Sequence, residues 1–340
     1  MKVLVTGGVG FIGSHTVVEL QQHGFEVVVI DNFENSDKLV LQQIQTITGK
    51  PLHFIEGDIR NKEDIRKVFK QHDDIEAVVH FAAYKAVGES VQKPLYYYEN
   101  NIGGTVNLLQ AMQEAKVQQL VFSSSCTVYG NVSAEMLPIT EDSPVVKANS
   151  PYGNTKKICE ELLQDFAKSD PIKIVSLRYF NPIGAHDSAL IGELPIGVPN
   201  NLVPFITQTA IGKRDKLTVF GNDYPTRDGS CIRDYIHVVD LAKAHVKAIQ
   251  FLNKTTTNYS VFNIGTGNGN TVLEVVKAFE KVSGKSLNYV VGSKRAGDVV
   301  QIYASCNKAK KELGWSAERS LENALETAWK WEIKLSGETQ

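Results

Sequence analysis

The first thirty residues of this chain, which has 340 in all, follow a pattern that few folds accommodate. Residues 2–6 (KVLVT) have the apolar, β-branched composition of a short buried strand. Glycines at positions 7, 10 and 13 follow at once, and a helical pattern then leads to a second apolar strand over residues 26–30. This order of elements forms a β-α-β unit, which is typical of an open parallel sheet with helices on both faces.

The same glycines indicate what the turn can bind. Glycine allows a tight turn, close approach of the backbone to a pyrophosphate, and close packing of the helix on the strand. The helix, which we expect to end near Gln22 with Gly24 as its stop, directs unpaired N–H groups at the same place. Asp31 lies eighteen positions after Gly13, where a carboxylate binds the hydroxyl groups of an adenosine ribose. Together these features predict a dinucleotide-binding site.

Asp31 also indicates which dinucleotide binds. A carboxylate here would repel the 2′-phosphate of NADP, and the next residues, Asn32, Phe33 and Glu34, offer no basic group to a phosphate. The simpler alternative, that Asp31 only starts a turn after the strand, is weakened by the glycine-rich turn upstream. We therefore predict NAD as the cofactor.

Strands and helices alternate through the first half of the chain. Further strands are predicted near residues 53–56, 77–80, 119–123 and 172–178, with helical patterns between them. This alternation predicts an α/β fold with a Rossmann-type, doubly wound parallel sheet. Ligands bind such sheets beyond the carboxyl ends of the strands. The polar residues that follow these ends include Asp58, Lys85, Ser123, Ser124, Ser125 and Asn181.

The amino-acid composition of the chain changes after Phe180. Five prolines between positions 182 and 225, together with many glycines, indicate a loop-rich region with short helices. We predict two domains: residues 1–180 bind the cofactor, and residues 181–340 form a smaller C-terminal α/β domain that binds the substrate. Segments near residues 236–265 are expected to return to the first domain as a further helix and strand.

A tyrosine and a lysine stand four positions apart at the start of a predicted helix. Ser150 is a favourable N-cap and Pro151 suits the first helical position, so the helix should begin there. Residues i and i+4 share one helix face, which places the phenol of Tyr152 beside the ammonium of Lys156. We expect Lys156 to lower the pKa of Tyr152 and so to make it an acid/base. The spacing alone is also common on solvated helix faces.

Composition argues against several other classes of protein. A formal net charge of -2, with scattered basic residues, argues against a nucleic-acid partner. The sequence has no apolar run of about 18 residues that could cross a membrane. Met1 leads directly into the first strand, so we expect a cytoplasmic protein without a signal peptide. Cysteine and histidine spacings fit no metal site, and we expect four reduced thiols: Cys126, Cys159, Cys231 and Cys306.

Six short motifs together resemble one known family. They are TGGVGFIG (residues 6–13), KAVGESV (85–91), SSSCTVYG (123–130), RYFNP (178–182), FGNDYP (220–225) and RDYIHV (233–238). Over nearly its whole length the chain is similar to the UDP-glucose 4-epimerases, also called UDP-galactose 4-epimerases, of the extended short-chain dehydrogenase/reductase superfamily. The resemblance implies an NAD-dependent isomerase of galactose metabolism that interconverts UDP-glucose and UDP-galactose.

The resemblance implies a mechanism in which the sugar is oxidised transiently at C4. Tyr152 removes the proton of the 4-hydroxyl group while the C4 hydride moves to NAD, which gives a 4-keto sugar. Ser125 hydrogen-bonds the C4 oxygen and helps to move the proton, and Lys156 binds the nicotinamide ribose and keeps the pKa of Tyr152 low. The keto sugar then turns over and takes the hydride back on its other face. Since NAD is restored in each turnover, we expect tight binding of the cofactor.

The resemblance also carries over contact residues by position. The implied cofactor contacts are Gly7, Gly10, Phe11, Ile12, Gly13, Asp31, Asn32, Asn35, Ser36, Asp58, Ile59, Phe81, Ala82, Ala83, Lys85, Asn100, Tyr152, Lys156 and Phe180. The implied substrate contacts are Lys85, Ser125, Tyr152, Asn181, Asn201, Leu202, Thr218, Val219, Phe220, Arg233, Arg295, Asp298 and Ile302. Among them Arg233 and Arg295 are expected to clamp the diphosphate with forked hydrogen bonds. The alternative for each arginine is an ion pair with Asp234 or Asp298.

Other functions on this fold remain alternatives. Nucleotide-sugar dehydratases carry an acidic pair directly after the active-site hydroxyl, and UDP-glucuronate decarboxylases carry a Glu there, whereas this chain has Cys126 and Thr127. A non-catalytic NAD-sensing regulator would usually lack the tyrosine or the lysine, and both are present. A simple alcohol dehydrogenase would leave the two arginines and the large second half of the chain without a purpose.

One position bears on the size of the sugar. In this family the residue four positions after Asp298, here Ile302, goes with whether an N-acetyl group fits beside the sugar. A tyrosine there goes with exclusion and a small residue with acceptance, and isoleucine is intermediate. UDP-glucose and UDP-galactose are therefore the expected substrates, and a UDP-N-acetylglucosamine (UDP-GlcNAc) 4-epimerase is an alternative.

The resemblance implies a homodimer formed through helices of the region that begins near Pro94. An apolar stripe recurs there at helical spacing, and we interpret it as core rather than interface. Its members are Leu95, Tyr98, Ile102, Val106, Leu109 and Met112.

Overall fold

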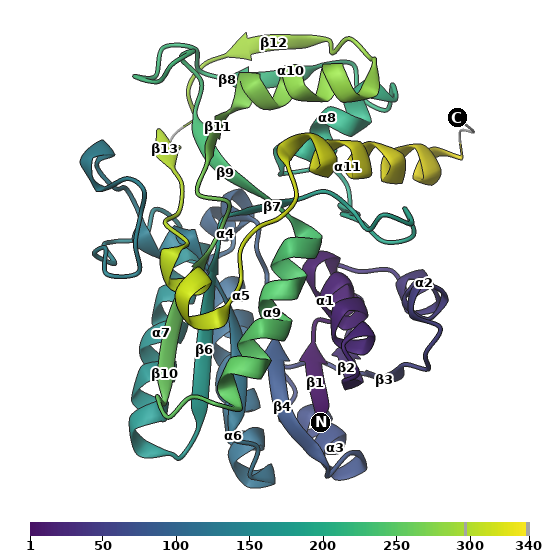
Figure 1. The fold of residues 1–340 in the computed structure, drawn as a ribbon, viewed down its shortest axis with the longest axis vertical. Helices are drawn as coiled ribbons and strands as arrows, with labels where there is room; N and C mark the ends of the chain where they lie inside the picture. The colour runs from purple at the N-terminus through teal and green to yellow at the C-terminus, as the bar shows by residue number, and fades with distance from the viewer. Residues whose placement is uncertain (296–297, 338–340) are drawn as a thin grey trace.

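A seven-stranded sheet forms the larger part of the molecule, in a computed structural model that describes residues 1–295 and 298–337 (Figure 1). Residues 296–297 and 338–340, which fall in the predicted second domain, lie outside the described residues. The strand order is β10-β6-β5-β4-β1-β2-β3, and every neighbouring pair is parallel. The strands are β1 (Lys2–Thr6), β2 (Glu26–Asp31), β3 (His53–Glu56), β4 (Ile75–His80), β5 (Gln119–Ser125), β6 (Lys173–Tyr179) and β10 (Tyr259–Ile264). The predicted α/β fold class and the predicted strands are confirmed.

Helices cover both faces of this sheet because successive strand residues point to opposite sides. Val3 and Val5 of β1 pack into one cluster with α1 (Phe11–Gln22), α2 (Leu39–Thr48) and α9 (Val238–Leu252). Leu4 packs into a second cluster on the other face. The helices there are α3 (Lys62–Gln71), α6 (Gly104–Ala115) and α7 (Pro151–Ser169). The strand order reverses at β1, so a crevice is expected beyond the carboxyl ends of β1 and β4.

The predicted start of α7 and the predicted end of α1 are confirmed. The Ser150 side chain accepts a hydrogen bond from the Gly153 N–H group at 3.1 Å, and Pro151 is the first residue of α7. Helix α1 ends at Gln22, and Gly24 has a φ of 86°, which a residue with a side chain rarely adopts. These local signals fix where each helix begins relative to the strand before it.

The apolar stripe that begins near Pro94 is not a continuous core face, which corrects its interpretation. Helix α5 (Pro94–Tyr98) continues into a π-helical turn, η1 (Glu99–Gly103), before α6. A π-turn holds more residues than an α-turn and so rotates the following positions around the helix axis. Leu95 is therefore 81% exposed, whereas Met112 is fully buried. Only the C-terminal end of the stripe belongs to the core.

The smaller part of the molecule lies above the carboxyl ends of the large sheet (Figure 1). It contains the strands β7 (Asn181–Ile183), β9 (Ile232–His237), β11 (Gly269–Thr271) and β13 (Gln301–Ile302) in one sheet, and β8 (Leu217–Phe220) with β12 (Tyr289–Gly292) in another. Its helices are α8 (Leu202–Ala210), α10 (Val272–Ser283) and α11 (Leu321–Ser336). They enclose a core of their own that includes Ile206, Phe279 and Leu325.

The chain returns to the large sheet after building part of the smaller one. Strand β10 pairs with β6 in parallel register, and α9 packs into the same cluster as α1. The division of the chain near residue 181 into two domains stays a prediction. The remaining short elements are α4 (Val87–Gln92), η2 (Cys126–Tyr129), η3 (Ala134–Met136) and η4 (Ala309–Leu313).

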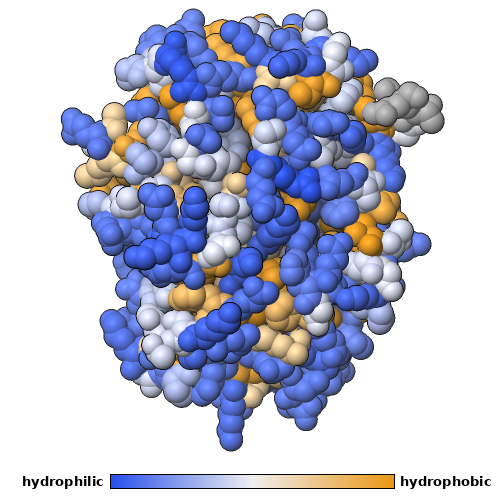
Figure 2. Space-filling view, viewed as in Figure 1, coloured by the Kyte–Doolittle hydropathy of each residue, from blue (hydrophilic) through white to orange (hydrophobic). Residues whose placement is uncertain are grey.

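The surface of the molecule is mixed in character. Figure 2 shows hydrophilic residues over most of one face, with small apolar patches between them. Among the described residues, no helix is both long and apolar enough to cross a membrane. All four cysteines are free, three of them buried, as the sequence predicted.

Candidate active site

The glycine-rich turn after β1 has the shape of a phosphate cradle. A Cβ atom on Gly13 would lie 2.2 Å from the Gly7 carbonyl oxygen, so only glycine allows α1 to start this close to the turn. Gly7 has a φ of 69°, and a Cβ atom there would lie 2.7 Å from the Ala82 nitrogen. The turn therefore offers bare backbone at the start of α1, where a pyrophosphate fits the unpaired N–H groups. These residues fit NAD.

Asp31 is held in place at the end of β2. Its carboxylate accepts hydrogen bonds from the backbone N–H groups of Val9 at 3.1 Å and Phe33 at 2.9 Å. The Ser36 hydroxyl donates a third hydrogen bond at 2.9 Å. The carboxylate thus ties the glycine-rich turn to the loop after β2, in which Phe33 adopts a left-handed φ of 58°. Asp31 and Ser36, two of the predicted cofactor contacts, share one site.

Asp31→Ala should weaken NAD binding by about 10- to 100-fold, since hydrogen bonds to a charged group contribute about 1.5–3 kcal/mol. Titration calorimetry with NAD on protein freed of cofactor measures this change. Asp37→Ala is a suitable control because it removes an exposed carboxylate from the same loop. Unchanged NAD affinity in Asp31→Ala would contradict the assignment.

Sequence reasoning missed Arg60, which organises the neighbouring part of the site. The Asp58 carboxylate accepts hydrogen bonds from Arg60 at 2.6 Å and from Asn32 at 2.9 Å. Burial alone would raise the pKa of Asp58, but these hydrogen bonds outweigh it and lower the pKa to about 2. Arg60 also pairs with Glu34 at 3.2 Å. Because both carboxylates already engage this guanidinium, it is poorly suited to attract an additional phosphate, in agreement with NAD.

The row of serines at the end of β5 meets the start of α7. The Ser125 hydroxyl lies close enough to the Tyr152 phenol to lower the pKa of that phenol. The Thr127 hydroxyl donates to Ser125 at 3.0 Å. One turn along α7, the Lys156 ammonium donates to the Ser123 carbonyl at 2.6 Å and to its hydroxyl at 3.2 Å. The predicted catalytic residues Ser125, Tyr152 and Lys156 are thus brought together.

The expected effect of Lys156 on Tyr152 is not observed. Burial raises the pKa of Tyr152 to about 12, and the nearby Ser125 hydroxyl offsets this only in part. The residues that shift this pKa are Ser125 and Cys126, whereas the Lys156 ammonium is bonded to Ser123. Burial lowers the pKa of Lys156 itself to about 8. The i, i+4 spacing put both residues on one helix face correctly, but it did not fix where the long lysine side chain ends.

A buried ion pair that the sequence did not reveal supports this corner of the site. Arg178 of β6 bonds both carboxylate oxygens of Glu160 on α7, at 3.0 and 2.6 Å, and both side chains are buried. Ser124 donates to Glu160 at 2.5 Å, and Arg178 donates to the Tyr129 hydroxyl at 2.9 Å. Glu160 follows Lys156 by four positions, so the helical spacing contained a signal that was not used. The pair fixes α7 against the ends of β5 and β6.

The two predicted diphosphate ligands lie in the smaller part and face one carboxylate. Arg295 donates to both oxygens of Asp298 at 3.1 and 3.0 Å, and Arg233 lies 3.9 Å from the same carboxylate. The Arg295 guanidinium also lies 4.7 Å from the ring centre of Phe220. Asp234, the alternative partner considered for Arg233, instead accepts hydrogen bonds from Thr266, Gly267 and Ala304. The predicted alternative of ion pairs with Asp298 is therefore present, whereas the alternative of an ion pair between Arg233 and Asp234 is wrong.

The remaining predicted contact residues differ in what they present to a ligand. The Asn201 side chain donates to Glu193 at 2.5 Å, and the Asn100 side chain donates to Asn101 at 2.9 Å. Ile302 of β13 packs with Cys126 and Phe180 in a small buried cluster. Three further side chains are buried, so their backbone is the part available for contact: Ile59, Phe180 and Val219.

Comparisons with known proteins agree with this geometry. The family model described as GDP-mannose 4,6 dehydratase matches residues 4–328. A UDP-glucose 4-epimerase of Bacillus subtilis is 52% identical over 334 residues, which cover 98% of this chain and 97% of that protein.

Two solved structures are also similar. One is a UDP-glucose-4-epimerase from Stenotrophomonas maltophila with bound NAD and formylated UDP-arabinopyranose. It has a TM-score of 0.96 and 48% identity, and 99% of each chain is covered. The other is a UDP-glucose 4-epimerase from Bifidobacterium longum in complex with NAD+ and UDP. It has a TM-score of 0.94 and 45% identity, with 98% of each chain covered.

Proposed function

The chain belongs to the UDP-glucose 4-epimerase family of the extended short-chain dehydrogenases/reductases, and from this we propose that it interconverts UDP-glucose and UDP-galactose. The observation that carries the proposal is the meeting of Ser125, Tyr152 and Lys156 where the start of α7 packs against the end of β5. A hydroxyl pair at this place can take a proton from one sugar oxygen and return it to the same oxygen. Inversion of C4 without net oxidation requires this reversibility.

The chain's own residues move the proton and hold the reactants. Tyr152 acts as the base, and Ser125 connects its phenol to the sugar 4-hydroxyl group. When bound, NAD supplies the hydride acceptor at C4 and a positive ring that favours the phenolate. The residues that would hold it are the glycine-rich turn, Asp31 and Lys156. Because the high pKa of Tyr152 keeps its phenol protonated near neutral pH, catalysis depends on a nearby positive charge that favours the phenolate.

Dehydration is the runner-up, since the matching family model bears the name of a dehydratase. Elimination of water needs an acid beside the active-site hydroxyl. Burial raises the pKa of the Cys126 thiol to about 12, so this thiol is a poor acid. The Thr127 hydroxyl is bonded to Ser125 and does not ionise. These two neighbours favour epimerisation over elimination.

The proposed reaction requires that the diphosphate of the substrate is held firmly and its hexose loosely. Arg233 and Arg295 are held toward the same carboxylate, that of Asp298, so two guanidinium groups converge where a diphosphate would bind. Phe220, which is exposed beside Arg295, offers an aromatic face to the nucleotide. The hexose must instead be held loosely, because the keto sugar has to turn over between the two hydride transfers.

One incubation tests the proposal. Purified protein is mixed with UDP-galactose without added cofactor, and UDP-glucose is measured by chromatography. We expect conversion, since NAD that is restored in each turnover should stay with the protein. No conversion, even after NAD is supplied, would refute the proposed activity.

Ile302→Tyr should reduce turnover of UDP-GlcNAc by at least about 10-fold, since a bulkier side chain would occupy the space of the N-acetyl group. Turnover of UDP-galactose should change much less. Ile302 lies on β13 opposite Arg233 of β9, so it is close to the proposed diphosphate site. Ile302→Leu, which conserves volume, is the control. Equal and high turnover of UDP-GlcNAc in the wild type and in Ile302→Tyr would show that this position is not the gate.

We further propose a cytoplasmic homodimer, on resemblance to the family. The region from α4 to α6 exposes Val87, Val91 and Leu95, which suits a helical interface. Sedimentation equilibrium of the purified protein distinguishes a dimer from a monomer.

A further inference from the structure

One loop of the smaller part is bonded to the C-terminal helix and contacts Lys85 of the larger part. It runs from Gly184 to Glu193, between β7 and α8. The Ala185 N–H group donates to the Thr327 hydroxyl of α11 at 3.1 Å. Arg319, just before α11, bonds both carboxylate oxygens of Asp187 at 2.7 and 2.6 Å. The loop is therefore fixed along its length before it reaches Glu193.

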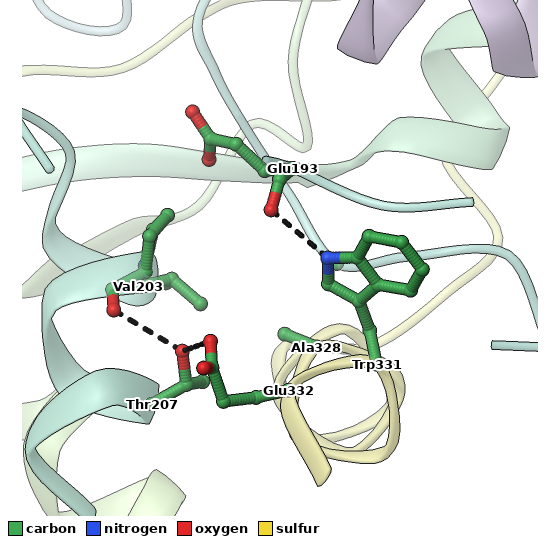
Figure 3. Close-up of a pocket in the computed structure, with 8 residues that line it drawn as sticks. Glu193, Val203, Thr207, Ala328, Trp331 and Glu332 are labelled. Carbon is green, nitrogen blue, oxygen red and sulfur yellow. Dashed lines mark hydrogen bonds between the residues drawn. The ribbon is translucent and has the colours of Figure 1, made fainter. Parts of the chain in front are cut away.

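Trp331 of α11 fixes the end of this loop. Its indole N–H group donates to the backbone carbonyl of Glu193 at 2.9 Å, and Figure 3 shows the Glu193 carboxylate extending away from the indole. The preceding residue, Gly192, lies directly on the ring, where a Cβ atom would come within 2.6 Å of ring carbons. Trp331 thus restrains the backbone of Glu193, from which the carboxylate side chain extends.

The Glu193 carboxylate joins two predicted substrate contacts that come from different parts of the molecule. One oxygen, Oε1, accepts a hydrogen bond from the Asn201 amide at 2.5 Å and one from the Lys85 ammonium at 3.3 Å. Asn201 precedes α8 in the smaller part, whereas Lys85 follows β4 of the large sheet. The Glu193 side chain is 11% exposed and that of Lys85 is 58% exposed. The largely covered carboxylate therefore restrains the Lys85 side chain, which would otherwise sample many rotamers.

We propose that Glu193 is a positioning residue, which holds Lys85 and Asn201 ready to bind the UDP-sugar. The inference rests on the proposed function. Restraining a long side chain before binding removes part of the entropy cost that binding would otherwise incur. The Glu193 carboxylate, 3.3 Å from the Lys85 ammonium, also attracts it and so limits the directions in which this side chain points. Glu193 touches neither the reacting hydroxyl groups nor the glycine-rich turn, so its effect should fall on substrate binding rather than on the chemical step.

Two substitutions of Glu193 separate its charge from its shape. Glu193→Gln keeps an oxygen for Asn201 but loses the charge that holds Lys85, and it should raise KM for UDP-galactose about 3-fold. Glu193→Ala loses both contacts and should raise KM about 10-fold, with kcat within about 2-fold of the wild type. Glu318→Gln is the matched control, since it breaks the Lys243–Glu318 pair of 2.9 Å, which lies outside this group of residues. It should leave KM unchanged.

Trp331→Phe tests the base of the arrangement without touching the carboxylate. It removes the N–H donor to Glu193 but keeps an aromatic ring against Gly192. We expect KM to rise about 2- to 5-fold, again with little change in kcat. Thermal unfolding of each holoenzyme variant identifies any that fold poorly, and a poorly folded Glu193→Ala leaves Glu193→Gln and Trp331→Phe to decide.

Titration calorimetry with UDP-glucose separates failure of this inference from failure of the proposed function, since it needs no turnover. A wild type that converts no UDP-galactose, with weaker UDP-glucose binding in Glu193→Ala, would refute the epimerase activity and support the positioning role. An unchanged or tighter dissociation constant in Glu193→Ala would overturn the positioning role. A loss of kcat at unchanged KM would overturn it as well, because Glu193 would then act on the chemical step.

Discussion

Tyr152→Phe should lower kcat by about 1,000-fold, the largest effect on activity that we expect from any single substitution. The change removes only the hydroxyl group that lies near Ser125 and, in the proposed mechanism, takes the sugar proton. The phenyl ring fills the same volume, and neither the glycine-rich turn nor the arginine pair is touched. We therefore expect the NAD content, the melting temperature and the KM for UDP-galactose to change little.

Steady-state conversion of UDP-galactose measures this effect, with NAD content determined on the same samples. Tyr98→Phe is a matched control because its hydroxyl accepts a hydrogen bond from Asn154 in the first turn of the same helix, at 2.6 Å. It should keep nearly full activity. If Tyr152→Phe keeps more than about a tenth of the wild-type kcat, another group serves as the base and the proposed mechanism is wrong.

Glu160→Gln should lower the free energy of unfolding by about 3–5 kcal/mol, the largest effect on stability that we expect. The substitution leaves the buried guanidinium of Arg178 without its counter-charge, and it weakens the acceptor for Ser124. Arg178→Met should cost a similar amount because it leaves the Glu160 carboxylate buried and unpaired. The double variant removes both charges and should therefore cost clearly less than the sum of the two single changes.

Urea unfolding of the wild type, both single variants and the double variant gives the four free energies that this comparison needs. Glu114→Gln is a control for an exposed pair, since Glu114 bonds Arg66 at the surface at 2.7 Å. It should change the free energy of unfolding far less than either buried substitution. Strict additivity of the two buried substitutions would show that Glu160 and Arg178 do not stabilise each other.

Features that depend on neighbours in sequence could be predicted. The seven parallel strands, the glycine-rich turn and the start of α7 at Ser150 follow from apolar patterns, glycine positions and capping residues a few positions apart. Asp31 and Ser125 then lie at one edge of the sheet, because parallel strands share one carboxyl edge. Sequence reasoning therefore reached the fold, and the roles of the site residues stay predictions.

Features that depend on distant pairing could not be predicted. Glu193 meets Lys85 across 108 positions, and nothing in either local sequence marks the partner. The π-turn η1 rotates the residues after it relative to those before it, so the apolar stripe that begins near Pro94 does not lie on one helix face. This turn could not be predicted, because its extra residue leaves no signal in the pattern of apolar residues. The position of the Lys156 ammonium was also predicted wrongly, because it bonds Ser123 and not Tyr152. Four rotatable bonds separate this ammonium from the helix, so the helical spacing does not fix where it lies.

The late return of the chain to the large sheet has a consequence for how the protein is made. Strand β10 pairs with β6 on the side away from β5, yet residues 180–258 lie between them and contribute several strands of the smaller part. During synthesis the first six strands leave the ribosome before β10 exists, so one edge of β6 stays unpaired until β10 is made. Asn263 of β10 also accepts the Tyr129 hydrogen bond, so the cluster around Arg178 is closed only then. The nascent chain must protect this edge from other strands until its last partner arrives.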